Sequence, residues 1–415
     1  MATTTIPQTR VPQLSRLQLL GIGAAVIGLA LLALGFVMNP TQFAKSYIFG
    51  FYFSMAFPLG CLGWLMIQHL TGGAWGVTTR RMLEAGALTM PIFFILSLPV
   101  VFIAYNQSIG LNHYVYEWAN PAVVTPGSPE FVPVIAHKVP WLTPAWFAGR
   151  MLIYFTIWST LALLLRMWSL QQDRGGNAVA AATRMRMLSG IGIALFVISV
   201  TFFAFDVGMS LDARWYSSMY GAHYMENTGL TTLAFLVLAL TQVRRTAIFE
   251  AHVPVKPIHD LGKLMLAFTI LWTYLSYGQY VIIWSADLAE SVPWYVRRTG
   301  NGWVFIALTL MCCSFFAPFF ALLGRRPKQN LSYLSVIAVL ILLMRFIDVS
   351  WIILPEFHAS PLEAYTTFTN YAAPLGLFGV FLSLWTFNMQ RASLLPLNDA
   401  NMDILRLHAG GHHSS

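Results

Sequence analysis

The sequence is poor in charged residues and in cysteine. Only 10% of its 415 residues are Asp, Glu, Lys or Arg, against roughly 25% in ordinary soluble domains, so a water-soluble globular protein is excluded. The three cysteines, Cys61, Cys312 and Cys313, lie in apolar runs without CxxC or CxxCH spacing. The chain therefore offers no motif for an iron–sulfur cluster, covalently attached haem or a zinc finger, and we expect no disulfide framework. The net charge of +8 comes from short basic clusters between apolar runs, a pattern that does not indicate nucleic-acid binding.

Long apolar segments make up most of the sequence. Hydrophobic residues account for 57% of the chain, and the mean hydropathy is +0.64. A membrane-spanning helix needs about 20 mostly apolar residues. The sequence holds ten such candidates, at 17–38, 45–69, 85–105, 146–169, 188–208, 217–242, 261–285, 302–323, 332–354 and 370–390. We therefore predict an all-α integral membrane protein with about ten transmembrane helices.

Two of these candidates need comment. The sixth has the weakest signal, because His223, Glu226 and Asn227 lie in its first half. The first follows two arginines, as a signal peptide does. It is longer than an apolar signal core, however, and no A-x-A cleavage site follows it, so we expect it to be retained as a helix.

The placement of basic residues predicts the orientation. With the N-terminus on the cytoplasmic side, 17 of the 24 Lys and Arg residues fall in cytoplasmic connections or tails. Because cytoplasmic loops carry the excess of positive charge, we expect both termini to be cytoplasmic. The longest connection, at 106–145, is then external, and its Pro and aromatic content predicts a packed cap. The histidines of the C-terminal tail are expected to belong to a disordered end.

An internal repeat relates two parts of the chain. The fifth predicted helix ends "FAFDVGMSL" and the ninth contains "RFIDVSWIIL", while the third and seventh both run into segments rich in Tyr and Trp. An offset of four helices preserves orientation, which predicts two four-helix bundles (helices 2–5 and 6–9) and two peripheral helices. The corresponding units are 1–44, 45–210 with the external loop, 211–355, and 356–415.

Charged side chains within the predicted spans are candidates for a proton pathway. Such residues are costly in a bilayer and usually face the interior of a helix bundle. Asp206 and Asp348 form the repeat-related pair, and Arg345 lies one helical turn before Asp348. One interpretation is a neutralised Arg345–Asp348 salt bridge that only holds the bundle together. The other is a proton relay, because burial raises the pKa of a carboxyl group toward neutrality. The predicted proton-pathway residues are Asp206, Asp348, Arg345, Glu226, His69, Glu84 and Asp260.

The seventh predicted helix carries a polar and aromatic stripe. Thr273, Ser276, Tyr277, Tyr280 and Trp284 recur at helical spacing. An interfacial aromatic belt explains the last three, whereas a flat ligand with two oxygens, such as menaquinone or ubiquinone, would use the whole stripe. The predicted quinone-binding residues are His113, Tyr277, Tyr280, Trp284 and Asp206. We expect no haem in this chain, because facing mid-membrane histidines are lacking.

Four stretches together resemble a known family. They are "FFAFDVGMSLDARWYSSMYG", "LGKLMLAFTILWTYLSYGQYVIIWSADLAESVPWYVRR", "GRRPKQNLSYLSVIAVLILLMRFIDVSWIILPEF" and "LEAYTTFTNYAAPLGLFGVF". They are similar to the NrfD-like family of polysulfide-reductase-type membrane subunits, and within it to the shorter such subunit of bacterial alternative complex III. The resemblance implies quinol oxidation at the outer face and proton translocation. It implies as partners a second NrfD-like subunit, an iron–sulfur subunit and c-type haem subunits.

Two other functions remain open on the sequence. A stand-alone secondary transporter would also use repeats and buried acids, but matched Gly or Pro breaks at mid-span are few. A purely structural anchor subunit would use the same charges as buried salt bridges.

Overall fold

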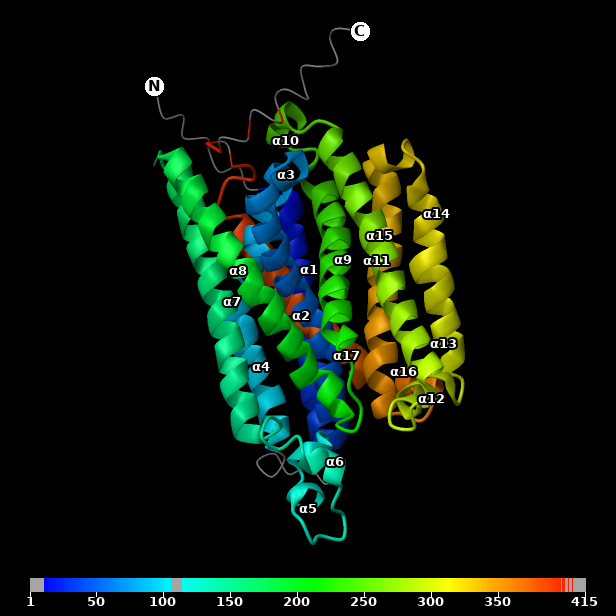
Figure 1. Ribbon diagram of the computed structural model, residues 1–415. Helices are drawn as coiled ribbons and strands as arrows, with labels where there is room; N and C mark the ends of the chain where they lie inside the picture. Colours follow the sequence, from blue (N-terminus) through cyan, green and yellow to red (C-terminus); the bar gives the residue numbers. More distant parts are fainter. Residues whose placement is uncertain are drawn as a thin grey trace.

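The computed structural model describes residues 11–105, 114–175, 177–396, 398–399, 402 and 405, and over these residues the secondary structure is helical, without strands. The long helices run side by side (Figure 1). His113, predicted as a quinone ligand, and the histidines of the C-terminal tail lie outside the described residues.

Eight helices of the described chain are long and apolar enough to cross a membrane. They are α1 (Pro12–Met38), α2 (Pro40–Thr71), α7 (Pro144–Asp173), α8 (Ala178–Val207), α11 (Lys256–Ala286), the stretch from α13 (Trp303–Leu310) to α14 (Ala317–Leu323), α15 (Leu331–Ile353) and α17 (Thr369–Met389). The sixth predicted span forms α9 (Met219–Val243), which is not among the eight. A multi-pass membrane protein is the fold class that these helices support.

The third predicted span is not one continuous helix. Its first three residues belong to the end of α3 (Ala74–Ala87), and most of the rest forms α4 (Met90–Ala104). The two helices together are apolar enough to span but are bent by 42°. Pro91 lies at the start of α4 and has no N–H to donate to the carbonyl of Ala87. Thr89 in the break donates its hydroxyl to the carbonyl of Gly86 at 2.7 Å. The prediction of a single helix over 85–105 is therefore corrected.

The first and last long helices lie along one another in opposite directions. A Cβ atom added at Gly28 would lie 2.3 Å from the backbone nitrogen of Gly376 and 2.4 Å from its Cα. Gly21 approaches Ser383 and Gly35 approaches Thr369 in the same way. Small residues allow this close backbone contact between membrane helices. We call the end where α1 begins and α17 ends the terminus end, and the opposite end the loop end.

Helix α2 lies at the centre of the molecule, and its most apolar stretch is completely buried. It contacts α3, α8, α9 and α17; α7 packs on α4 and α8, and α9 packs on α11 and α15. Aromatic rings fill the junction of α2, α9 and α17, where Phe57, Phe235 and Phe381 meet with ring centroids 5.2–5.8 Å apart. By contrast, α11 and α13–α14 are largely exposed at one side of the bundle.

Short elements fold over the loop end (Figure 1). They are η2 (Glu117–Ala119), α5 (Pro121–Val124), α6 (Pro133–Ala136), η3 (Met209–Leu211), α12 (Val292–Thr299), η6 (Leu354–Glu356) and α16 (Pro361–Thr366). The connection predicted as an external cap is anchored there: Tyr116 donates its hydroxyl to the carbonyl of Val207 at 3.1 Å, and the Lys138 ammonium donates to the carbonyl of Ala213 at 2.6 Å. At the terminus end, α10 (Ala247–His252) and η5 (Pro327–Gln329) join the long helices.

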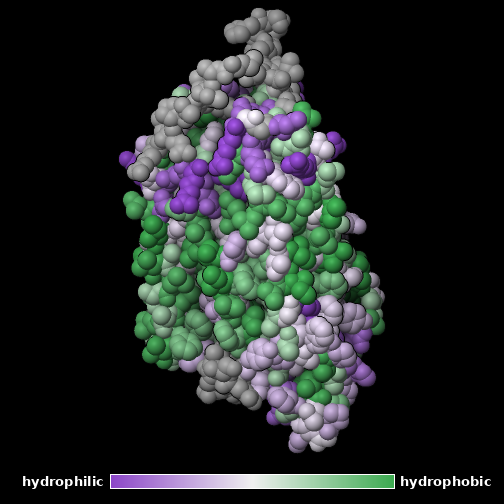
Figure 2. All heavy atoms as spheres, turned by 90° about the vertical axis from the view of Figure 1, so that its left-hand side faces the viewer, coloured by the Kyte–Doolittle hydropathy of each residue, from purple (hydrophilic) through white to green (hydrophobic). Residues whose placement is uncertain are grey.

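The surface has the zoning of a membrane protein. Figure 2 shows a broad hydrophobic belt around the middle of the visible face, with hydrophilic residues gathered above and below it. Exposed leucine, isoleucine and valine side chains on α1, α7 and α8 contribute to the apolar surface. Such a large exposed apolar area fits a lipid environment.

Candidate functional site

Asp206, at the loop end of α8, is completely buried and fully hydrogen-bonded. Arg150 of α7 donates Nε to Oδ2 and Nη2 to Oδ1, both at 2.8 Å. Tyr154 donates its hydroxyl to Oδ2 at 2.8 Å, and Trp141 donates Nε1 to Oδ1 at 3.1 Å. A bidentate guanidinium with two neutral donors stabilises the charged form of a carboxyl group. Asp206 is thus half of a buried ion pair.

A hollow of about 330 Å³ opens beside this ion pair at the loop end. Its walls include Trp141, Phe202, Lys138 and Asp212, with Asp206 at one side. Trp141 and Phe202 present ring surfaces 5.1 Å apart between centroids. Burial lowers the pKa of the Lys138 ammonium. The hollow therefore combines aromatic faces with charged groups of both signs.

Asp348 of α15 is the second buried carboxylate of the loop-end half. Its Oδ2 accepts from Asn227 Nδ2 at 2.7 Å, from Trp272 Nε1 at 3.2 Å and from Arg345 Nη1 at 3.4 Å. Arg345 also donates Nη2 to the hydroxyl of Ser314. Ser314 belongs to η4 (Met311–Phe316), a π-helical segment between α13 and α14, and such segments frequently occur at functional sites.

The two aspartates share one arrangement of arginine and tryptophan. In each case an arginine pairs with the carboxylate and lies over the indole of a tryptophan that also donates to it. The Arg150 guanidinium carbon is 4.2 Å from the Trp141 ring centroid, and that of Arg345 is 4.6 Å from the Trp272 ring centroid. The sequence predicts the repeat-related aspartates, but it does not predict that both are held by an Arg–Trp pair.

Glu226 of α9 differs from both aspartates. It is only 3% exposed, and neither carboxyl oxygen has a hydrogen-bond partner among the described residues. The charges of Arg345 and Asp348 act on it. Nearby on the same helix, His223 shares a 3.0 Å hydrogen bond with Ser276 of α11. Burying a charge without a partner is costly, so the neutral acid is the form that fits this site.

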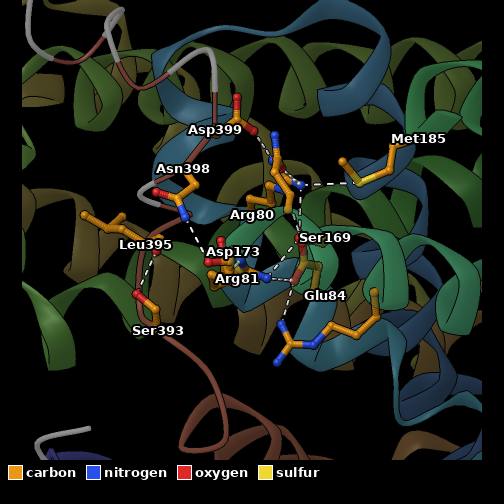
Figure 3. A network of polar contacts seen from close by, with 12 residues as sticks. Arg80, Arg81, Glu84, Ser169, Asp173, Met185, Ser393, Leu395, Asn398 and Asp399 are labelled. Carbon is orange, nitrogen blue, oxygen red and sulfur yellow. Dashed lines mark hydrogen bonds and ion pairs between the residues drawn. The ribbon is translucent and has the colours of Figure 1, made fainter. Parts of the chain in front are cut away.

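A second polar cluster lies at the terminus end (Figure 3). Glu84 of α3 is buried among three arginines: Arg80 at 3.1 Å, Arg81 at 2.7 Å and Arg166 at 2.5 Å. Ser169 donates its hydroxyl to Glu84 at 2.5 Å.

Two further carboxylates complete the charge balance of this cluster. Asp399 pairs with Arg80, and Asp173 pairs with Arg81. Asn398 donates Nδ2 to the backbone carbonyl of Asp173 at 2.8 Å. Three arginines therefore face three carboxylates, and the C-terminal segment covers the cluster (Figure 3).

The other two predicted proton-pathway residues also lie at the terminus end. His69 of α2 has a buried Nε2 without a hydrogen-bond partner in the described chain, and it lies within reach of the charges of Arg80 and Glu84. Asp260, in the first turns of α11, accepts from Lys263 at 3.3 Å. The seven predicted residues thus form three groups: one at Asp206, one at Asp348 with Arg345 and Glu226, and one at the terminus end.

The predicted quinone-binding residues that the structure describes lie at α11 and at Asp206, beside two different hollows. Tyr277 and Trp284 are 65% and 71% exposed on the outer face of α11. Tyr280 and Trp284 line a separate open hollow of about 330 Å³, together with Asp287, Val292 and Tyr295. Burial raises the pKa of Tyr295, which lies outside the spanning helices. Asp206 borders the other hollow.

Arg150 is the most important residue that the sequence reasoning missed. It lies near the start of the predicted span 146–169, next to the external connection. The same principle that singles out Arg345 applies to it, because an arginine inside a span needs a buried partner. Arg166 in the same helix carries the same signal.

Comparisons with known proteins give no family for this chain. No protein-family model matches it, and no curated protein matches its sequence.

Proposed function

We propose that the chain is an integral membrane subunit of a quinol:electron-acceptor oxidoreductase of the alternative complex III type. The four stretches that resemble NrfD-like subunits support this proposal, as does the helical, apolar architecture. On this proposal ten helices cross a bacterial cytoplasmic membrane, with the terminus end in the cytoplasm. The first four-helix unit is α2, α3–α4, α7 and α8, and the second is α9, α11, α13–α14 and α15. Helices α1 and α17 are peripheral to both units.

The role of the chain is to move protons, and the environment of Glu226 is the observation that supports this role. A buried carboxyl group without a hydrogen-bond partner in the described chain makes no polar contact that would offset the free-energy cost of burying it. Asp348 and Arg345 lie close enough for their charges to act on it. An acid that is neutral at rest, next to a fixed ion pair, can accept and release a proton as that pair is perturbed.

Asp206 and Asp348 then act as fixed charges that set the field around the pathway. Each is already paired with an arginine, which gives the carboxylate a fixed counter-charge. Glu84, held by three arginines, is a further fixed charge at the cytoplasmic end, where His69 and Asp260 supply titratable groups. Serine and threonine hydroxyls of α2 and α9 lie between the two ends; Ser54 and Thr232 among them are buried with no partner in the described chain.

Menaquinone or ubiquinone is the proposed quinone, bound reversibly in the hollow beside Asp206. The hollow offers Trp141 and Phe202 for ring packing and Lys138 for a quinone oxygen. The hollow at Tyr280 and Trp284 is the second candidate. Electrons pass to partner chains: the second NrfD-like subunit, the iron–sulfur subunit and the c-type haem subunits.

Purification of the affinity-tagged chain in mild detergent tests this function. A subunit of the proposed complex co-purifies with c-type haem absorbance and quinol-oxidising activity. A chain that purifies alone, without haem, would contradict the proposal and favour a free-standing transporter. The satisfied hydrogen bonds of Asp206 favour the anchor function as the second candidate. An anchor would keep full proton translocation when Glu226 is replaced by Gln.

A further inference from the structure

A group of basic side chains lies at the terminus end, where η5 packs against α11. Lys328 of η5 is buried along its stem: its Cβ and Cγ lie 3.0 Å from the position that a Cβ on Gly262 would occupy. Its ammonium is 3.5 Å from the carbonyl oxygen of Leu323, the last residue of α14. The stem is therefore fixed at the junction of α11 and α14.

Three more cations lie near this position, one on α11 and two just before η5 in the chain. Lys263 of α11 has a 56% exposed side chain, and Arg325 and Arg326 are exposed between α14 and η5. Asp260 is the carboxylate of this group, paired with Lys263 at 3.3 Å. Burial and the Lys263 ammonium both lower the pKa of Lys328. The cations repel one another and outnumber the carboxylate. The group therefore attracts an anion.

The surface next to these cations is apolar. From Lys263, the exposed side of α11 continues through Ala267, Ile270 and Tyr274, at spacings of four, three and four residues that keep them on one face. The end of η4 exposes Phe316, and α14 exposes Phe320 and Leu323 just before the arginines. Each face therefore has cations at one end and apolar side chains along its length.

We propose that the group formed by Lys263, Lys328, Arg325 and Arg326 binds the phosphate headgroup of an anionic phospholipid whose acyl chains cover the exposed faces of α11 and α14. Basic pockets beside membrane helices on the cytoplasmic side are suited to such headgroups. A lipid held here would complete the side of the molecule that α11 and α14 leave exposed. The inference rests on charge and surface alone and is independent of the proposed proton pathway.

Lipid retention by the full-length purified protein tests this inference. The delipidated protein is titrated with phosphatidylglycerol and, separately, with phosphatidylcholine, and bound lipid is counted by native mass spectrometry. We expect preferential retention of phosphatidylglycerol. K263Q with K328Q should weaken its binding by about fivefold for each cation removed. R325Q with R326Q should do the same, and these exposed side chains are not needed for packing.

The matched control is R184Q with R186Q, which removes two exposed arginines of α8 at the same end of the bundle. It should leave phosphatidylglycerol retention unchanged. Equal loss in the control and in both test pairs would overturn the proposal, because it would show non-specific attraction to the surface. Displacement of the lipid by millimolar inorganic phosphate would overturn it as well, in favour of a site for a small free anion.

Discussion

Removing Arg150 while Asp206 stays in place separates a structural ion pair from an independent acid. Arg150→Met deletes two of the four hydrogen bonds to the Asp206 carboxylate and leaves those from Trp141 and Tyr154. Asp206 is 0% exposed, so the lost donors come from within the packed protein. Removing one partner of a buried pair costs about 3–5 kcal/mol, whereas replacing both by apolar residues is often neutral. Arg150→Met and Asp206→Leu should each destabilise the protein, and the double variant should recover most of the loss.

Chemical denaturation of the purified protein, followed by tryptophan fluorescence, measures this cycle. Arg214→Met is the control, because Arg214 pairs with Glu117 on the exposed surface, where an ion pair contributes about 0–1 kcal/mol. A loss below about 1 kcal/mol for Arg150→Met would refute the pairing. A double variant that loses the sum of the two single losses would refute it too.

Three further predictions concern other parts of the structure. Gly28→Leu should separate α1 from α17 and lower the thermal midpoint, since even a Cβ would meet the Gly376 backbone at 2.3 Å; an unchanged midpoint would contradict the contact. Burial lowers the pKa of His358 below its ordinary 6.5 despite its hydrogen bond to Glu363. The folded ring therefore takes up a proton less readily than the unfolded one, and stability falls as the pH drops below about 6.5; His358→Gln should flatten this fall in thermal scans. Glu84→Gln leaves three buried arginines short of a counter-charge and should cost about 3–5 kcal/mol, measured by denaturation, whereas Glu84→Asp should cost less.

The positions of the long helices follow from hydropathy, because twenty apolar residues in succession have few alternatives to a membrane helix. The break between α3 and α4 also has a signal in the sequence, namely Pro91. The flanking residues are nevertheless apolar enough to suggest one continuous span. Hydropathy indicates that a segment lies in the membrane, but it does not report how the segment bends there.

The partners of the buried charges were much harder to predict. Asp206 and Arg150 are 56 residues apart, and Glu84 and Arg166 are 82 apart. No local pattern links residues at such separations, because their meeting depends on how whole helices pack. Arg345 and Asp348, one turn apart, are the exception, because their spacing already offered a salt bridge as one of two interpretations, and the structure pairs them. That Glu226 lacks a partner in the described chain could emerge only after its neighbours had been placed.

Proton release per electron tests the proton role of Glu226 most directly. The complex containing this chain is reconstituted into liposomes, supplied with quinol and an electron acceptor, and followed with an external pH indicator. We predict that Glu226→Gln lowers the ratio while quinol oxidation continues, and that Glu226→Asp keeps part of it. Glu130→Gln, in the exposed loop, should leave it unchanged. An unaltered ratio in Glu226→Gln would contradict the account.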